Sequence, residues 1–371
     1  MPVRMGKAAL VALGAISVCG YGKSDVGSAF AEKGVTTPAT TDTERSGRRP
    51  YARGPGLQWT FRNSGAPAEV TSMAESVDGK FVVWGDSRGV VRVLRLAEKG
   101  IVELRGDRGE GRRRCGVLDI LCGHGGRVRW LAADGMLRVR SMPRKRDDGA
   151  VKVNEVEGLL TSEAKATCDG VVVVVWTKAR WPWQRKQGLL RLRFAGEERK
   201  RVASLPVFPR QRGANELIGH LALSPDGRLL AAVADGDVAV LDVASMKILR
   251  RFGRGWGEAA AFSPSSKRLA VGTDGRGVLV WDVATGRLVK EVPLHRASDG
   301  SILAFQSENS LYAGSGPRSE LYYIELETGR AVVFGRFAGM CKILVSKSKG
   351  RVLLGLRTGD IVSCIARSEP K

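Results

Sequence analysis

The stretch Trp176–Gly188, WTKARWPWQRKQG, brings together side chains that could bind an anion. It contains three Trp and the cations Lys178, Arg180, Arg185 and Lys186. Guanidinium forks match the oxygens of carboxylates and phosphates, and Trp adds a large apolar contact surface. The stretch lies between two apolar runs, VVVVVW and LLRLRF, that are typical of strands. It is therefore either a binding loop for an anionic group or an enlarged turn whose Trp side chains pack on neighbouring strands.

The residue types that most often carry out catalysis are sparse and scattered. The three His, His124, His220 and His295, fall in different segments. No Ser or Cys stands in a nucleophile-elbow pattern, and none of the six Cys forms a C-x-x-C pair or a zinc-ligand spacing. Asp235 and Asp237 could bind calcium, but Asp-Gly is a preferred hairpin connection, which favours a turn. We therefore expect no enzyme activity, no cofactor and no metal site.

The charge balance indicates what kind of partner to expect. Sixty Lys and Arg stand against 38 Asp and Glu, so the formal net charge is +22 and the isoelectric point is about 10.2. Such a balance favours nucleic acid, an acidic protein, an acidic polysaccharide or a lipid surface. The alternative is that the cations are scattered over the surface and serve no partner.

The N-terminal residues have the pattern of an export signal. A basic start, MPVRMGK, precedes the apolar run AALVALGAISVCG, and Ala29 and Ala31 form an A-x-A-like cleavage site. Residues 1–31 are predicted to be a signal peptide, with a frayed helix as the alternative, so export to the cell envelope and a cytoplasmic location both remain open. Residues 32–56 have no apolar periodicity and are predicted to be a disordered linker. No apolar run is long enough to span a bilayer comfortably.

An internal repeat organises the remaining residues. A short apolar run, a turn rich in Asp, Gly or Pro, and further alternating apolar runs recur at intervals of mostly about 40–45 residues, which is the spacing of propeller blades. The turns align at Asp78, Gly125, Asp169, Asp226, Ser265, Asn309 and Lys349. The longest interval lies between Asp169 and Asp226 and contains Trp176–Gly188, which marks that stretch as an insertion.

Several of these turns resemble those of the WD-repeat β-propeller family, in a divergent, bacterial-type form. The resemblance is carried by Ser224-Pro225-Asp226-Gly227, Ser263-Pro264, Val280-Trp281-Asp282 and Ala284-Thr285-Gly286. It implies an all-β propeller fold, and the seven aligned turns predict that residues 57–371 form a single β-propeller of seven blades. Each blade is expected to have four antiparallel strands, named a to d from the centre outward.

The last repeat unit lacks a fourth strand, and an alternating apolar segment, Leu57–Phe61, precedes the first unit. We expect this N-terminal strand to supply the outer strand of the last blade, because such pairing joins the chain ends and protects an open sheet edge.

In the resembled family the d–a and b–c connections open on one face of the propeller. Most basic clusters of this sequence fall in those connections, and Trp side chains accompany them. The predicted partner-binding residues are Arg112, Arg113, Arg114, Lys178, Arg180, Trp181, Trp183, Arg185, Lys186, Arg210, Arg212, Arg254, Trp256 and Arg276.

These observations predict a monomeric, non-enzymatic interaction scaffold that binds an acidic protein through a basic, Trp-containing face. The first alternative is that the same face binds nucleic acid or another polyanion, since bases stack on Trp while phosphates meet Arg. The second is an enzyme that uses the central channel, which a wall of only apolar residues would dismiss.

Overall fold

Short runs of β-branched and aliphatic residues, separated by Gly, Asp and Pro turns, form strands throughout the computed structural model. The structure describes residues 52–53, 56–63, 67–76, 78–97, 100–105, 116–122, 127–133, 136–141, 146–152, 160–166, 171–179, 185–193, 218–234, 237–253, 257–273, 276–294, 302–315, 319–346 and 350–367. All of them belong to one compact unit, Lys33–Lys371. They contain no helix. The predicted signal peptide lies outside the described residues.

The strands form antiparallel sheets, each named here by its innermost strand. The β3 sheet holds β3 (Val70–Glu75), β4 (Phe81–Asp86), β5 (Val90–Arg95) and β6 (Ile101–Arg105). The β7 sheet holds β7 (Val117–Cys122), β8 (Arg127–Ala132), β9 (Met136–Ser141) and β10 (Arg146–Lys152). The β11 sheet holds β11 (Leu160–Ala166), β12 (Val171–Ala179) and β13 (Arg185–Arg193).

The later sheets repeat this plan. The β14 sheet holds β14 (Ile218–Leu223), β15 (Leu229–Ala234), β16 (Asp237–Asp242) and β17 (Ile248–Phe252). The β18 sheet holds β18 (Gly257–Phe262), β19 (Arg268–Thr273), β20 (Gly277–Asp282) and β21 (Leu288–Val292). The β22 sheet holds β22 (Ile302–Phe305), β23 (Ser310–Ser315), β24 (Glu320–Glu325), β25 (Arg330–Phe337) and β1 (Ala52–Arg53). The β26 sheet holds β26 (Met340–Ser346), β27 (Arg351–Leu356), β28 (Ile361–Ile365) and β2 (Leu57–Phe61).

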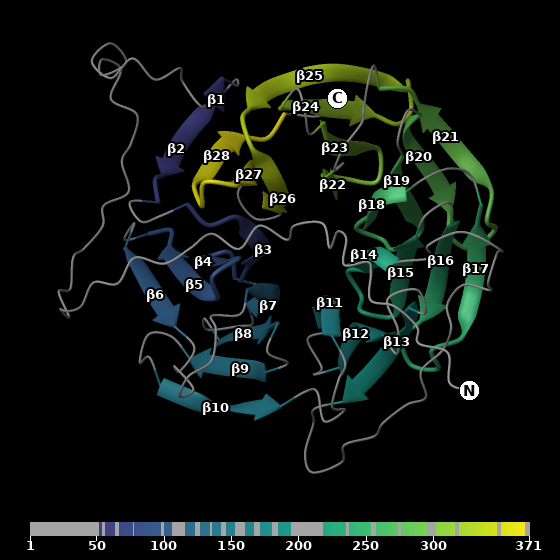
Figure 1. The fold of residues 1–371 in the computed structure, drawn as a ribbon. Helices are drawn as coiled ribbons and strands as arrows, with labels where there is room; N and C mark the ends of the chain where they lie inside the picture. Colours follow the sequence, from purple (N-terminus) through teal and green to yellow (C-terminus); the bar gives the residue numbers. More distant parts are fainter. Residues whose placement is uncertain are drawn as a thin grey trace, which may run out of the picture. The chain divides into compact units, whose positions relative to one another are not determined.

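The innermost strands make a closed circuit around a central channel. Each one contacts the innermost strand of the next sheet, from β3 through β7, β11, β14, β18, β22 and β26 back to β3. Figure 1 shows these strands nearest the centre, with the other strands of each sheet farther out. This arrangement is a β-propeller, as predicted.

The expectation of seven four-stranded blades is wrong. The described residues form six complete blades, that is, sheets with four strands or more, whereas the β11 sheet has three strands. The β11 sheet has a long hairpin instead: β12 and β13 pair from Val171↔Arg193 to Ala179↔Arg185. The turn spacing predicted repeat units with the same number of strands. The unit at the longest interval, which forms the β11 sheet, does not follow that prediction.

The N-terminal strand closes the last sheet, as the alternating pattern of Leu57–Phe61 predicted. β2 pairs with β28 from Leu57↔Cys364 to Phe61↔Ile361. Just beyond it, the Asn63 N–H donates to Asp360 Oδ1 at 2.7 Å. β1 falls within the segment predicted to be a linker, yet Ala52 pairs with Phe337. The ordered structure therefore begins before Leu57.

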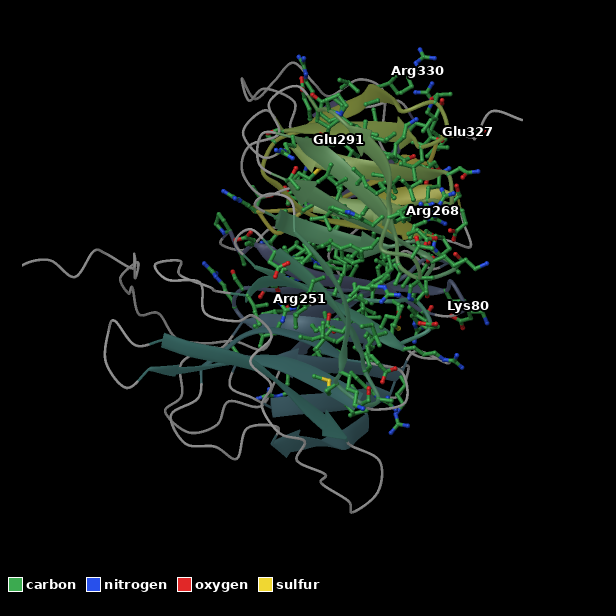
Figure 2. All side chains as sticks on the ribbon, turned by 90° about the vertical axis from the view of Figure 1, so that its right-hand side faces the viewer. Lys80, Arg251, Arg268, Glu291, Glu327 and Arg330 are labelled. Atoms are coloured by element: carbon green, nitrogen blue, oxygen red, sulfur yellow. The ribbon has the colours of Figure 1, made fainter. Side chains whose placement is uncertain are left out.

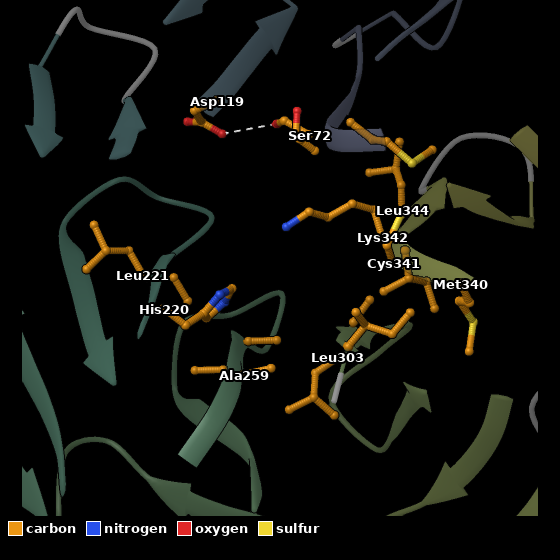
Figure 3. A pocket seen from close by; sticks show the side chains of 18 of the residues that line it. Ser72, Asp119, His220, Leu221, Ala259, Leu303, Met340, Cys341, Lys342 and Leu344 are labelled. Carbon is orange, nitrogen blue, oxygen red and sulfur yellow. Dashed lines mark hydrogen bonds between the residues drawn. The ribbon is translucent and has the colours of Figure 1, made fainter. Parts of the chain in front are cut away.

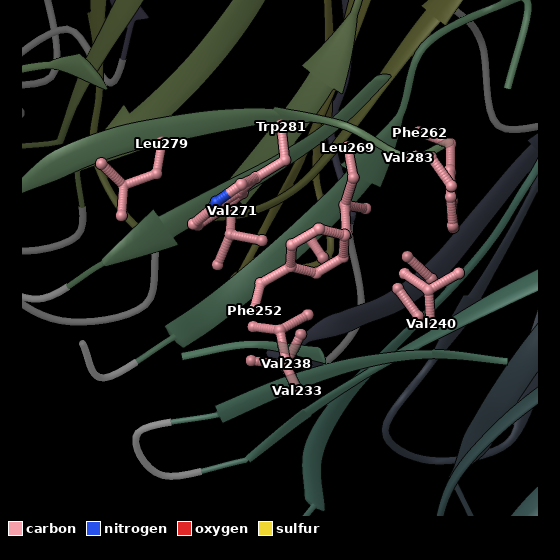
Figure 4. Packing of buried hydrophobic residues seen from close by; sticks show 13 residues of the cluster. Val233, Val238, Val240, Phe252, Phe262, Leu269, Val271, Leu279, Trp281 and Val283 are labelled. Carbon is pink, nitrogen blue, oxygen red and sulfur yellow. The ribbon is translucent and has the colours of Figure 1, made fainter. Parts of the chain in front are cut away.

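Hydrophobic cores fill the spaces between neighbouring sheets. The core shared by the β14 and β18 sheets buries Phe252 against Trp281, with ring centroids 5.4 Å apart, and aliphatic side chains surround the pair (Figure 4). Burying one side chain of this kind contributes about 1.5–3 kcal/mol. The sheets are therefore held mainly by apolar packing.

Glycines in second strands let adjacent sheets approach closely. A Cβ on Gly85 would lie 2.6 Å from the Val117 side chain of the next sheet, and one on Gly355 would lie 2.6 Å from Val70 Cγ1. Both contacts are with the first residue of the neighbouring innermost strand. Glycine is required here for space, and Gly355 lies where the last sheet meets the first.

The a–b turns are built by short polar residues. The Ser76 hydroxyl donates to Asp78 Oδ1 at 2.6 Å, and the Ser224 hydroxyl donates to Asp226 Oδ1 at the same distance. The Ser76 hydrogen bond holds the pKa of the Asp78 carboxyl below its ordinary value. The Ser-Pro-Asp-Gly signal seen in the sequence therefore has a local structural cause.

Candidate functional site: the d–a/b–c face and the central channel

The structure describes four of the predicted partner-binding residues. Arg276 lies exposed in the turn between β19 and β20, which is a b–c connection. Lys178 in β12 pairs with Lys186 in β13, and Ala179 pairs with Arg185. These three cations are thus strand residues of the extended hairpin. The others lie outside the described residues: Arg112, Arg113, Arg114, Arg180, Trp181, Trp183, Arg210, Arg212, Arg254 and Trp256.

Backbone hydrogen bonds join the d–a and b–c connections at one end of a sheet. In the β3 sheet the Ser87 N–H donates to the Glu69 carbonyl at 2.9 Å. In the β26 sheet the Arg357 N–H donates to the Gly339 carbonyl at 2.8 Å. The d–a and b–c connections described so far therefore share a face, which we call the d–a/b–c face.

Three exposed cations on this face are unpaired within the described part of the chain. Arg62 follows β2, Arg88 lies in the β4–β5 turn, and Arg276 lies in the β19–β20 turn. No ion pair or hydrogen bond joins their guanidinium groups to a described residue. Their charge is available to a partner.

The carboxylates of the same face are already engaged. Asp86 accepts from Arg92 at 2.8 Å, Asp237 accepts from Arg251 at 3.1 Å, and Glu320 accepts from Arg336 at 2.9 Å. Asp360 accepts the Thr358 hydroxyl at 2.8 Å. These carboxylates belong to internal contacts and leave the free arginines uncompensated.

The opposite face carries charges of both signs. Figure 2 shows Lys80, Arg268, Glu327 and Arg330 along one side of the propeller, with Arg251 farther from that edge. Arg268 donates to the Glu308 carbonyl at 2.7 Å, and the Glu308 carboxylate accepts the Ser265 N–H at 2.6 Å. Some charged side chains of the opposite face are therefore bound within its turns.

A cavity of about 970 Å³ occupies the central channel. Its wall is mixed: polar side chains from several innermost strands alternate with Ala, Leu, Ile and Met. Figure 3 shows Lys342 and His220 directed into the cavity, with Ser72 and Asp119 hydrogen-bonded to each other beside it. The wall is therefore not purely apolar, so the observation that would have dismissed an enzyme in the channel is not made.

Four of the polar residues that line the channel occupy one repeated position of the innermost strands, where a fifth strand has Ala. In five innermost strands a register shift precedes the residue that lines the cavity. Such β-bulges re-aim the side chain that follows them. The five residues, which we call the channel belt, are Ser72, Asp119, His220, Ala259 and Lys342.

Sequence reasoning missed the channel belt, although a signal existed. In four units the belt residue stands four positions before a buried Ser at the end of the innermost strand. The belt residues Ser72, His220, Ala259 and Lys342 precede Ser76, Ser224, Ser263 and Ser346. Aligning the units on that Ser would have brought a hydroxyl, an imidazole and an ammonium group to one level.

Two of the side chains in the channel wall, Ser72 and Cys341, form hydrogen bonds within the protein. The Ser72 hydroxyl donates to Asp119 Oδ1 at 3.3 Å and accepts the Ile120 N–H at 3.2 Å, so it bridges two sheets. Cys341 Sγ donates to two backbone carbonyls, and burial raises the pKa of its thiol to about 12. A thiol with that pKa is protonated near neutral pH and is a poor nucleophile.

Burial also raises the pKa of the Cys122 and Cys364 thiols to about 12. No group of three or more His, Cys, Asp or Glu among the described residues is arranged to hold a metal ion. In the same residues no helix has the length and apolar character needed to cross a membrane.

Comparisons with known proteins point to the fold. No protein-family model matches the sequence, and no curated protein matches it either. A solved structure that it resembles is the β-propeller domain of Cps50 (Swd1) from Myceliophteria thermophila. The TM-score is 0.62 at 14% sequence identity, over 83% of this chain and 99% of that domain. The likeness shows the β-propeller fold, and membership of the WD-repeat family, in its bacterial-type form, stays a prediction.

Proposed function

We propose that this protein is a non-enzymatic interaction scaffold that binds an acidic protein through its d–a/b–c face. One observation carries the proposal: Arg62, Arg88 and Arg276 have no partner among the described residues, while Asp86, Asp237, Asp360 and Glu320 on that face have internal ones.

Unpaired arginines favour carboxylate partners for a physical reason. The guanidinium group is always charged and presents a planar set of donors that fits a carboxylate in two-pronged fashion. A net charge of +22 also steers acidic molecules toward the protein before contact. The predicted cations and Trp residues of the neighbouring connections would enlarge the same face.

The fold supports a scaffold role. A propeller holds loops from every sheet at one end of a rigid ring, and surface loops on a rigid frame commonly bind partners. An enzyme in the channel has less support, because the Ser72 hydroxyl bridges two sheets and the Cys341 thiol is held protonated by burial.

The test compares two triple Arg→Gln variants of the full chain. One changes the unpaired arginines, Arg62, Arg88 and Arg276. The matched control changes exposed arginines of the opposite face, namely Arg228, Arg287 and Arg330. The probes are a capped oligoglutamate peptide and a single-stranded oligothymidylate of the same net charge, titrated at low and at high salt.

We expect the first variant to weaken peptide binding roughly tenfold, because exposed ion pairs are worth only a few tenths to 1 kcal/mol each. The control should change it by less than about twofold. Equal effects of the two variants would contradict the proposed face. Tighter binding of the oligothymidylate than of the peptide would instead support the nucleic-acid alternative.

A further inference from the structure

The channel belt places polar side chains at one level of the cavity. Each belt residue is the third residue of its strand in β3, β7, β14, β18 and β26, counted from the d–a connection. The belt therefore lies nearer the d–a/b–c end of the channel. Toward the other end the wall becomes apolar, with Leu223, Phe262, Phe305 and Val345.

Lys342 is the cation of the belt. Its side chain projects into the cavity (Figure 3), and no described residue accepts a hydrogen bond or forms an ion pair with its ammonium group. The preceding residue, Cys341, points away and bonds to the carbonyls of Val70 and Gly355. The register shift between Met340 and Lys342 explains why the two neighbouring side chains point in different directions, since it turns Lys342 toward the channel.

The remaining belt residues limit the kind of charged group that the channel can bind. His220 also projects into the cavity and adds an imidazole ring to its wall. Asp119, held by Ser72 on the same belt, repels a second negative charge. A channel belt that holds one ammonium group and one carboxylate suits a singly charged carboxylate better than a doubly charged phosphate.

We propose that Lys342 anchors a carboxylate that enters the channel from the d–a/b–c face, and that this carboxylate is an Asp or Glu side chain of the acidic partner. The inference rests on the proposed function, because the partner that covers the face supplies the side chain. Arg357 and Glu69 lie at that mouth of the cavity and mark its entrance. Arg357 Nε is 3.9 Å from Glu69 Oε1.

The test uses the full chain with Lys342→Met, which keeps the length of the side chain and removes its charge. Lys267→Met is the matched control, since Lys267 is exposed in an a–b turn on the opposite face. Calorimetry measures binding of the capped oligoglutamate peptide, of succinate and of inorganic phosphate. Lys342→Arg tests for rescue by charge.

We expect Lys342→Met to weaken binding of the oligoglutamate peptide roughly tenfold, because a charge-assisted hydrogen bond is lost. Lys267→Met should leave binding nearly unchanged, and Lys342→Arg should retain most of it. The melting temperature of Lys342→Met should equal or exceed that of the wild type, since an unpartnered cation is replaced by an apolar chain. If Lys342→Met fails to fold, Lys342→Gln provides the same comparison.

The outcomes separate this inference from the proposed function. Peptide binding that depends on Arg62, Arg88 and Arg276 but not on Lys342 would overturn the channel site and leave the scaffold standing. Lys342-dependent binding of succinate without binding of the peptide would overturn two claims: that the partner is an acidic protein, and that the bound carboxylate is one of its side chains. Phosphate binding that is tighter than succinate binding would refute the choice of carboxylate.

Discussion

Phe61 lies at the seam where the first and last sheets meet, and its removal is expected to destabilise the propeller strongly. The side chain is 3% exposed and ends the closing strand β2. Its ring centroid lies 5.1 Å from that of Trp84 in the β3 sheet. The surrounding core also contains Leu353 and Ile361 of the β26 sheet. Phe61 thus joins two sheets that are far apart in the sequence.

The expected loss follows from burial. Truncation of a buried Phe to Ala costs about 3–5 kcal/mol, which includes the cavity left behind. The contact with Trp84 adds about 0.5–1.5 kcal/mol to an ordinary apolar contact. We therefore expect Phe61→Ala to lower the free energy of unfolding by about 4 kcal/mol and the melting temperature by roughly 10 °C.

Urea unfolding followed by circular dichroism and by Trp fluorescence measures this loss. Arg62→Ala is the control, because the adjacent Arg62 is exposed and should change the free energy of unfolding by less than about 0.5 kcal/mol. A Phe61→Ala loss below about 1 kcal/mol would show that the seam does not limit stability. Deletion of Leu57–Phe61 should be more severe, because it also leaves β28 with an unpaired edge.

Three further predictions concern stability. Arg92→Met should cost about 3–5 kcal/mol in urea unfolding, because it leaves the buried Asp86 carboxylate without its cation, and adding Asp86→Asn should restore part of the loss. Gly355→Ala should cost about 1–3 kcal/mol, since its Cβ would overlap the adjacent sheet, and an unchanged urea midpoint would refute the close approach. The Thr285 N–H holds the pKa of the Asp282 carboxyl below its ordinary value. The stabilisation that the ionised Asp282 contributes should therefore be present at neutral pH and lost as the pH falls through the lowered pKa; Asp282→Asn should remove that acid dependence.

Local chemistry allowed much of the architecture to be predicted from the sequence. Ser224, Pro225, Asp226 and Gly227 form a turn because a hydroxyl–carboxylate hydrogen bond and a glycine with a φ of 72° build it from neighbouring residues. The alternation of Leu57–Phe61 predicted a strand, and the missing fourth strand of the last unit predicted its partner. Such features depend on short spans of sequence.

The number of strands in each sheet and the channel belt depended on the tertiary structure. The β11 sheet departs from the repeat because β12 and β13 extend their pairing along nine residues, which turn spacing does not reveal. Lys342, His220 and Asp119 come from strands far apart in the sequence. They line the same cavity because register shifts re-aim their side chains and ring closure brings their strands around one channel, both of which are set by long-range backbone pairing.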